Sequence, residues 1–202
     1  MAASLLIAAA LLGACVCAQD VPPEARIESF TYNGAGCRQG TAVGDISVDG
    51  QALTIKFSEF GVSTDEQLVG KRKFCQLSIK VNSPAGWKYR LDTVTLLGYA
   101  RLDANVKSVH KVTCYLTGTP GMSSFFVEKE GPLDDNYEYS GAFDNETYSV
   151  CGPGGNLNLK MEVRINNDAD PAAEGVIDVD TADSQVTFEP SHALYVIKFT
   201  PC

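Results

Sequence analysis

The stretch Cys75–Arg101, CQLSIKVNSPAGWKYRLDTVTLLGYAR, sets the fold class through its alternation of apolar and polar side chains. Every second residue from Cys75 to Val81 is apolar, which is the period of a strand with one buried face. Residues 82–86 interrupt the pattern with a proline and a glycine, the residues typical of a turn. The alternation resumes at Trp87 and later shifts by one residue, which predicts a β-bulge near Asp92-Thr93.

The same two-residue period recurs along the rest of the chain, and no helical period is sustained anywhere in the sequence. The longest alternation runs from Leu157 to Ile165, and Asp49-Gly50 is typical of a hairpin turn. Residues 193–199 are apolar on both faces, which predicts a central strand, whereas the polar residues 61–73 are predicted to form a long loop. The pattern predicts an all-β fold, a single-domain, jelly-roll-like β-sandwich of roughly eight to ten strands.

The N-terminal segment is apolar and ends in small residues, which predicts a secretory signal peptide over residues 1–18. It is shorter than the ~20 apolar residues of a membrane-spanning helix, and no later segment reaches that length. The sequence therefore predicts an exported domain over residues 19–202 without a transmembrane segment. A second interpretation stays open, because Leu12-Gly13-Ala14-Cys15 resembles a bacterial lipoprotein processing site, at which Cys15 would be lipidated rather than removed.

The charge of the chain narrows the classes of partner. The net charge is −9 and is carried entirely by residues beyond the predicted signal peptide. An acidic chain is repelled by nucleic acids and by anionic membrane surfaces, so neither is predicted as a partner. The same charge suits a soluble extracellular protein.

Five of the seven cysteines lie beyond the signal segment, and an oxidising compartment would pair four of them. Cys114 is predicted to be the unpaired one, because it shares the inward parity of the apolar residues around it and a free cysteine behaves as a small buried hydrophobe. The four disulfide candidates allow three connectivities. Chain order alone favours Cys37 with Cys75 and Cys151 with Cys202, and peptide mapping would distinguish the three.

Several short landmarks follow one another in order along the chain. They are Gly34-Ala35-Gly36-Cys37, Asp49-Gly50-Gln51-Ala52-Leu53-Thr54, Cys75-Gln76-Leu77, Pro84-Ala85-Gly86-Trp87, Gly98-Tyr99-Ala100-Arg101-Leu102-Asp103, Gly131-Pro132, Cys151-Gly152, Asn156-Leu157-Asn158 and Cys202. Together they resemble the domain-of-unknown-function 4360 family, small secreted proteins of fungi and bacteria. The resemblance implies export, a disulfide-bearing β domain and no established activity. The four disulfide candidates match the family pattern, Cys114 does not, and no catalytic residue is carried over.

Direct signals of catalysis or of metal binding are weak in this sequence. The two histidines, His110 and His192, could serve as a base, but no nucleophile-elbow motif accompanies them, so no catalytic residue is predicted. Asp178, Asp180 and Asp183 lie close enough in the chain to offer oxygen ligands to Ca²⁺, although an exposed hairpin tip is the plainer interpretation. No other cofactor is expected.

Residues 134–146 mix acidic and aromatic side chains. Paired carboxylates beside tyrosine rings are typical of enzymes that act on sugars, but the same mixture is typical of a half-buried edge strand. Asn145-Glu146-Thr147 is a glycosylation sequon, which makes Asn145 a candidate for glycosylation on the surface.

These observations favour a secreted, non-enzymatic β-sandwich that works by surface interaction. Its partner would be a cell-wall polysaccharide, an extracellular protein such as a host molecule, or another copy of itself. The rival hypothesis is a secreted carbohydrate-active enzyme that uses acidic residues within 134–146 or 178–183. Geometry separates the two, because an enzyme needs two carboxylates about 5–10 Å apart in one groove.

Overall fold

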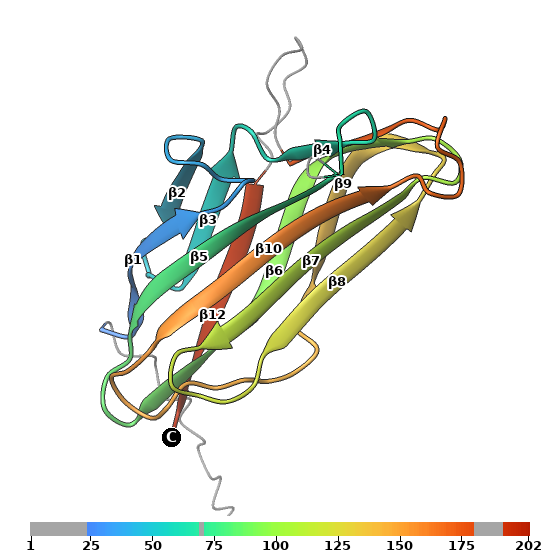
Figure 1. Ribbon diagram of the computed structural model, residues 1–202. Coiled ribbons are helices and arrows are strands. Elements are labelled where there is room, and N and C mark those ends of the chain that lie inside the picture. The colour runs from blue at the N-terminus through green and yellow to red at the C-terminus, as the bar shows by residue number, and fades with distance from the viewer. Residues whose placement is uncertain (1–23, 69–70, 180–191) are drawn as a thin grey trace, which may run out of the picture.

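The computed structural model describes residues 24–68, 71–179 and 192–202 (Figure 1). Within these ranges the chain forms twelve strands and no helix. The strands are β1 (Arg26–Asn33), β2 (Ala42–Ile46), β3 (Ala52–Phe57), β4 (Gly61–Ser63), β5 (Arg72–Asn82), β6 (Trp87–Leu102), β7 (Lys107–Leu116), β8 (Ser123–Glu130), β9 (Leu133–Ala142), β10 (Asn156–Asn166), β11 (Gly175–Asp178) and β12 (His192–Pro201). The predicted all-β class is confirmed, with more strands than the roughly eight to ten expected.

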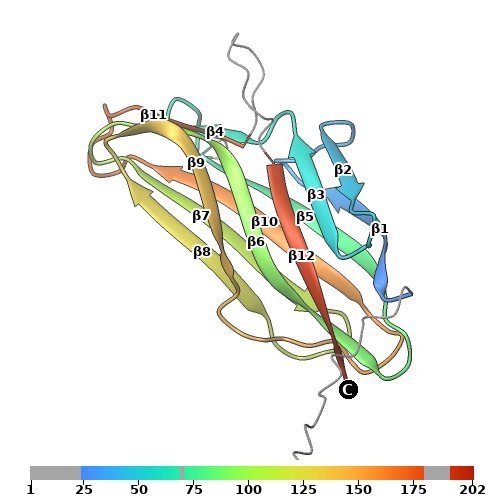
Figure 2. The same ribbon diagram turned by 180° about the vertical axis from the view of Figure 1, so that it is seen from behind.

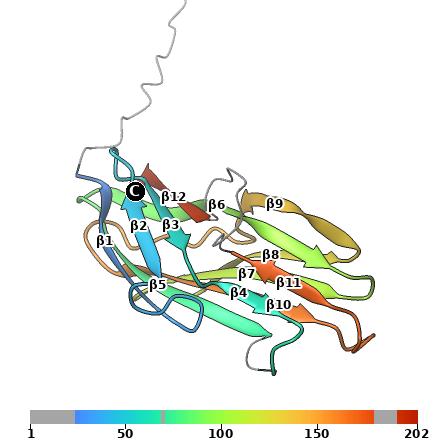
Figure 3. The same cartoon turned by 90° about the horizontal axis from the view of Figure 1, so that it is seen from above.

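The strands form two sheets that pack face to face (Figures 1 and 2). The five-stranded sheet has the order β1-β5-β10-β7-β8, and the seven-stranded sheet has the order β2-β3-β12-β6-β11-β4 with β9 paired to β6. Seen from above, the sheets lie as two layers (Figure 3). The chain crosses from one sheet to the other at most of its connections, as in a jelly roll, so the predicted β-sandwich is confirmed.

The two strands of the quoted stretch become β5 and β6, one in each sheet. The predicted bulge in β6 is visible in its pairing with β12, where Thr93 lies opposite Val196. The next pair is Leu91 opposite Ile197, so Asp92 is the extra residue and the prediction is confirmed. β12 lies between β3 and β6, which agrees with its prediction as a central strand.

The expectation of one long loop over residues 61–73 is wrong. Gly61–Ser63 forms β4, which pairs with β11, and β5 begins at Arg72. The short strand was missed because a single apolar residue, Val62, carries its buried side, and one residue is too few to show a period. The signal segment with Cys15 lies outside the described residues.

The inward side chains of both sheets form one hydrophobic core. Tyr195, in the middle of β12, is fully buried, and its Oη donates a hydrogen bond to Sδ of Met161 in β10 at 3.5 Å. This contact joins the two sheets at the centre of the sandwich. Removal of such large side chains from water is the main force that holds the layers together.

Two disulfides fasten connections to strands. Cys37, in the β1–β2 connection, bonds to Cys75 of β5, and Cys151, in the β9–β10 connection, bonds to the terminal Cys202. These are the pairs that chain order favoured. Cys114 is a buried free thiol. No helix of the described ranges is long and apolar enough to cross a membrane.

Candidate functional site

The outer face of the five-stranded sheet carries the aromatic side chains that are most open to solvent. Phe74 is 37% exposed, Tyr115 is 39% exposed and Phe126 is 55% exposed, and no other aromatic side chain of the described ranges reaches these values. They belong to three strands, β5, β7 and β8, and Figure 1 views this sheet from outside. We call this surface the aromatic face. Exposed apolar side chains are normally scattered singly over a protein surface. Several exposed aromatic side chains on one sheet face therefore indicate a binding surface.

The strand register arranges the three rings across the aromatic face. Phe74 lies opposite Glu162 of β10, which lies opposite Lys111 of β7, which lies opposite Phe126. The two phenylalanines therefore end one row across four strands and lie about 14 Å apart at a strand spacing of about 4.8 Å. Tyr115 lies four residues along β7 from that row. The three rings thus form a broad triangle on the outer face of the sheet.

Polar side chains lie around the rings on the same face. Gln76 donates a hydrogen bond from Nε2 to the hydroxyl of Tyr115 at 3.3 Å, and Nζ of Lys160 lies 5.0 Å from the centroid of Phe74. Amides and hydroxyls occupy further outward positions: Thr31, Asn33, Ser78, Thr113, Ser124, Asn156 and Asn158. Sugars offer apolar C–H faces and many hydroxyl groups, so rings bordered by amides and hydroxyls suit them.

A surface hollow of about 580 Å³ adjoins the aromatic face beside Phe74. Its lining comprises Thr31, Tyr32, Asn33, Gly34, Ala35, Phe74, Gln76 and Ser78. The volume falls within the range of small-ligand sites, about 300–1,000 Å³. The aromatic face therefore combines an open platform with a recess at one edge.

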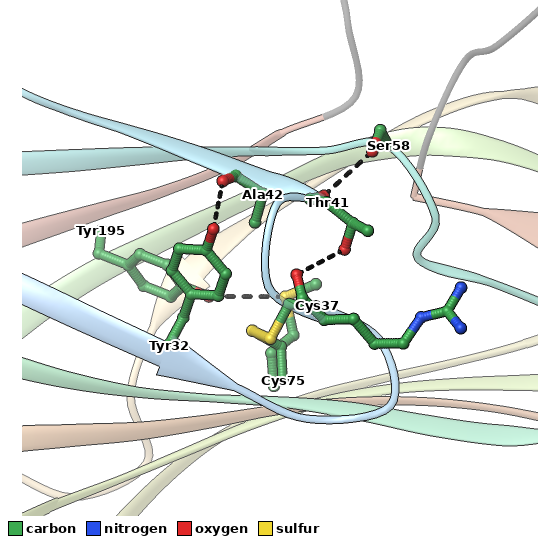
Figure 4. Close-up of a disulfide and its surroundings, with 9 residues drawn as sticks. Tyr32, Cys37, Thr41, Ala42, Ser58, Cys75 and Tyr195 are labelled. Atoms are coloured by element: carbon green, nitrogen blue, oxygen red, sulfur yellow. Dashed lines mark hydrogen bonds between the residues drawn. A yellow bond between two sulfur atoms is a disulfide. The ribbon is translucent and has the colours of Figure 1, made fainter.

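The wall of this hollow is the loop after β1, and three features hold it against β5. The N–H of Gly36 donates to the carbonyl of Phe74 at 2.9 Å. Gly34 has a φ of +150°, and a Cβ there would lie 2.3 Å from the same carbonyl oxygen, so only glycine allows this approach. The Cys37–Cys75 disulfide closes the loop. Figure 4 shows it near Tyr32, whose hydroxyl donates to the Ala42 carbonyl at 2.8 Å.

The structure brings together the two acidic regions that the sequence treated separately. The Tyr99 hydroxyl of β6 donates to Oδ1 of Asp134 at 2.7 Å, and Asp178 lies opposite Tyr99 on the neighbouring β11. The hydrogen bond to Asp134 raises the pKa of Tyr99. The strands β9 and β11, which carry these aspartates, flank β6. Asp134 lies opposite Arg101, two residues along β6 from Tyr99, so the backbones of the two aspartates are about 12 Å apart. Asp178 also lines a smaller hollow of about 270 Å³ with Glu59, Glu66 and Lys73.

The predicted calcium ligands are described only in part. Asp178 ends β11, whereas Asp180 and Asp183 lie outside the described residues. Across the ranges that are described, no three His, Cys, Asp or Glu side chains gather closely enough to hold a metal ion. A calcium ion at these three aspartates stays a prediction.

His110 is buried between the sheets and does not face solvent. It is 1% exposed, and its ring lies 4.8 Å from the ring of Tyr137 and 5.2 Å from that of Tyr139. Neither ring nitrogen has a hydrogen-bond partner among the described residues. Burial lowers the pKa of His110 to about 4 from 6.5. His110 is therefore a neutral core residue, remote from any base role; of His192, the structure describes only the backbone, opposite Lys56.

This buried histidine predicts an acid-sensitive fold. Between pH 6.5 and pH 4 the unfolded chain binds a proton that the folded chain does not, so the free energy of unfolding falls as the pH is lowered through this window. The loss reaches about 3 kcal/mol at pH 4, at about 1.4 kcal/mol for each pH unit between the two pKa values. Urea unfolding at several pH values should show a shallower slope for His110→Phe, and parallel curves for both proteins would contradict this prediction.

The structure also describes two further residues that the sequence singled out, Cys114 and Asn145. Burial raises the pKa of the Cys114 thiol, which keeps it protonated and unreactive. Asn145 is exposed and donates to Oδ1 of Asp144 at 3.2 Å. Asp144 in turn accepts the N–H of Ser124 in β8 at 2.6 Å. The glycosylation candidate therefore lies at the β8 rim of the aromatic face.

The fold and the surface together define a class, a disulfide-bonded β-sandwich with an open aromatic face on one sheet. The chain belongs to the family described as Domain of unknown function (DUF4360), whose family model matches residues 23–201. An uncharacterized secreted protein of Arthroderma benhamiae is 32% identical to it over 171 residues, which cover 81% of this chain and 68% of the relative.

Three solved structures show distant likenesses. TmCBM61, in complex with β-1,4-galactotriose, is 12% identical with a TM-score of 0.26, over 88% of this chain and 91% of that chain. The enzymatically active domain of bacteriophage CBA120 tailspike protein 4 is 9% identical with a TM-score of 0.25, over 85% and 19%. A family two carbohydrate esterase from Cellvibrio japonicus is 11% identical with a TM-score of 0.20, over 86% and 35%. TM-scores this low say nothing about what this chain binds.

The three rings of the aromatic face were not among the residues that the sequence singled out. A signal for them was present. Phe74 shares the parity of Gln76 and Ser78, and Tyr115 shares that of Thr113, so both rings stand at positions where the alternation expects polar side chains. Aromatic residues at solvent-facing positions of a strand are the pattern that points to such a surface.

Proposed function

We propose that this protein is an exported, non-enzymatic module that binds a cell-wall polysaccharide on the aromatic face. The observation that carries the proposal is the gathering of Phe74, Tyr115 and Phe126 on one sheet. Burying such rings against a sugar removes apolar surface from water at roughly 25 cal/mol per Å². The open face suits an extended chain better than a small molecule, which a closed recess would enclose more fully.

Three observations support an extracellular location in this proposal. The relative from Arthroderma benhamiae is described as secreted, the fold has two disulfides, and disulfides persist in oxidising compartments. We include in the proposal that residues 1–18 are removed as a signal peptide, which leaves residues 19–202 as one domain, and that Asn145 carries a glycan in a eukaryotic host. If Cys15 is lipidated instead, mass spectrometry of the exported protein would find that residue with its lipid.

The proposal is tested by measuring how the exported protein binds an array of cell-wall polysaccharides. The variant F74A/Y115A/F126A should bind about 100-fold more weakly than the natural protein, since each ring contributes about 1 kcal/mol and 1.4 kcal/mol is tenfold. The three side chains lie outside the core, so the variant should still fold, and its unfolding free energy is measured beside its binding. Calorimetry on the polysaccharides that the array identifies gives the affinity.

The matched control is V43A/L68A/V150A, which removes three exposed apolar side chains that lie off the aromatic face. It should bind like the natural protein. If the aromatic variant bound as tightly as the natural protein, the aromatic face would not be the binding surface. If the natural protein binds no polysaccharide but captures an extracellular protein, the class of partner is wrong.

One observation favours the rival function, a secreted carbohydrate-active enzyme. Asp134 and Asp178 flank Tyr99 on the outer face of the seven-stranded sheet, so acids from both 134–146 and 178–183 meet there. Their backbones are about 12 Å apart, and the two side chains would have to lean toward each other to reach the separation of about 5–10 Å that a catalytic carboxylate pair needs. Release of reducing sugars by the natural protein, lost in D134N and in D178N, would support this rival, whereas no release from any bound polysaccharide would exclude it.

A further inference from the structure

The centre of the aromatic face is positively charged although the chain is acidic. Glu162 of β10 is surrounded by four cations: Lys160 and Arg164 on its own strand, Lys111 opposite it on β7, and Arg72 on β5, opposite Arg164. This group of five residues, the Glu162 cluster, has a net charge of +3, four cations less one carboxylate. The whole chain has a net charge of −9. The sign of the charge is therefore reversed within this cluster, and Glu128 of β8 is the outward carboxylate in the row of Arg164.

The single carboxylate of the cluster is already engaged by two of the cations. Nη2 of Arg72 donates to Oε2 of Glu162 at 2.6 Å, and Nζ of Lys160 lies 3.8 Å from the same oxygen. Lys111 and Arg164 are exposed, and neither has a carboxylate within 4.0 Å among the described residues. Two cations thus remain available to an anionic ligand.

These cations lie between the rings that the proposed function assigns to sugar stacking. Lys111 stands in the row that ends at Phe74 and Phe126, directly opposite Phe126. Arg164 lies two residues beyond that row on β10. A polymer laid along this row would meet Phe74, then Glu162 with the two cations that engage it, then Lys111 and finally Phe126, within about 14 Å. A neutral glycan would leave the charges without partners, whereas an anionic glycan would pair with them.

We propose, on the basis of the proposed function, that the polysaccharide is polyanionic and that its uronate carboxylates bind Lys111 and Arg164. Phe74 and Phe126 pack against the sugar rings on either side. Charge complementarity carries the inference, because electrostatic attraction selects partners of opposite sign. The interaction is exposed to solvent, so its strength falls as salt is added.

The experiment compares binding to polygalacturonate and to neutral galactan at low and high salt. The affinity for polygalacturonate should fall with salt and should fall about tenfold in K111Q/R164Q, since each exposed ion pair contributes up to about 1 kcal/mol. E162Q, which removes the only anion of the cluster, should raise that affinity about threefold. Binding to the neutral polymer should be unchanged in both variants.

The control K56Q/K198Q removes two exposed lysines from the outer face of the seven-stranded sheet and makes the same change in net charge. It should bind polygalacturonate like the natural protein. Equal affinity for both polymers with no effect of salt would overturn this inference and leave the proposed function standing. If the protein bound neither polymer and no other polysaccharide, the proposed function itself would be overturned. Salt-sensitive binding to RNA alone would assign the cluster to nucleic acid and would also overturn this inference.

Discussion

The variant C37A/C75A is expected to lose about 4 kcal/mol of unfolding free energy. The disulfide closes a loop with a sequence separation of 38, and a loop of that length restricts the unfolded chain by about this amount. Both cysteines are fully buried, so alanine leaves small cavities but no unsatisfied polar group. Urea unfolding followed by fluorescence measures the loss.

The second disulfide provides the matched comparison for this experiment. C151A/C202A opens a loop of similar separation, 51, at the far end of the chain, and should cost a similar free energy. The two variants should differ in binding, because only Cys37–Cys75 holds the loop that forms the hollow beside Phe74. Polysaccharide affinity should drop in C37A/C75A alone. Equal affinities in both variants would show that the hollow plays no part in binding.

Tyr195→Ala should lower the free energy of unfolding by a similar amount to C37A/C75A, about 4 kcal/mol. Tyr195 is fully buried in β12 at the centre of the seven-stranded sheet, and its ring reaches Met161 of the opposite sheet. Removal of the ring loses the free energy gained by burying it. It also leaves a cavity, which the two sheets could close only by breaking other core contacts. Thermal and urea unfolding at neutral pH should both report the change.

Tyr195→Phe separates packing from the hydrogen bond. It keeps the ring and removes only the donation to Sδ of Met161, a weak acceptor, so it should cost less than about 1 kcal/mol. If the phenylalanine variant were as unstable as the alanine variant, the hydroxyl and not the ring would hold the layers together. A loss below about 2 kcal/mol for alanine would mean that the core repacks around the cavity.

Local features of this fold were predictable wherever one residue's environment depends on its near neighbours in the chain. The bulge at Asp92 could be read from the change of phase between Leu91 and Val94, since each strand face repeats every two residues. The same reasoning placed Cys114 inside the sandwich and β12 in the middle of its sheet. Strand β4 could not be found this way, because its one buried side chain belongs to a contact with β11 more than 100 residues away.

The sequence predicted the types of residue at the candidate sites but not their arrangement in space. Acids and tyrosines were identified, but the meeting of Asp134 with Asp178 depends on β9 and β11 pairing with the two edges of β6. Phe74 and Tyr115 of the aromatic face are more than 30 residues apart in the chain, so no local pattern joins them.

The order of apolar and polar side chains alone determined that this chain makes strands, which side of each strand is buried, and which cysteines are available for bonding. Those properties are local, because a pleated strand turns successive side chains to opposite faces whatever it pairs with. Only the tertiary structure decided which strands lie side by side. That choice gathered three rings and four cations on one surface, since pairing partners are selected by the packing of the whole core and not by any single segment.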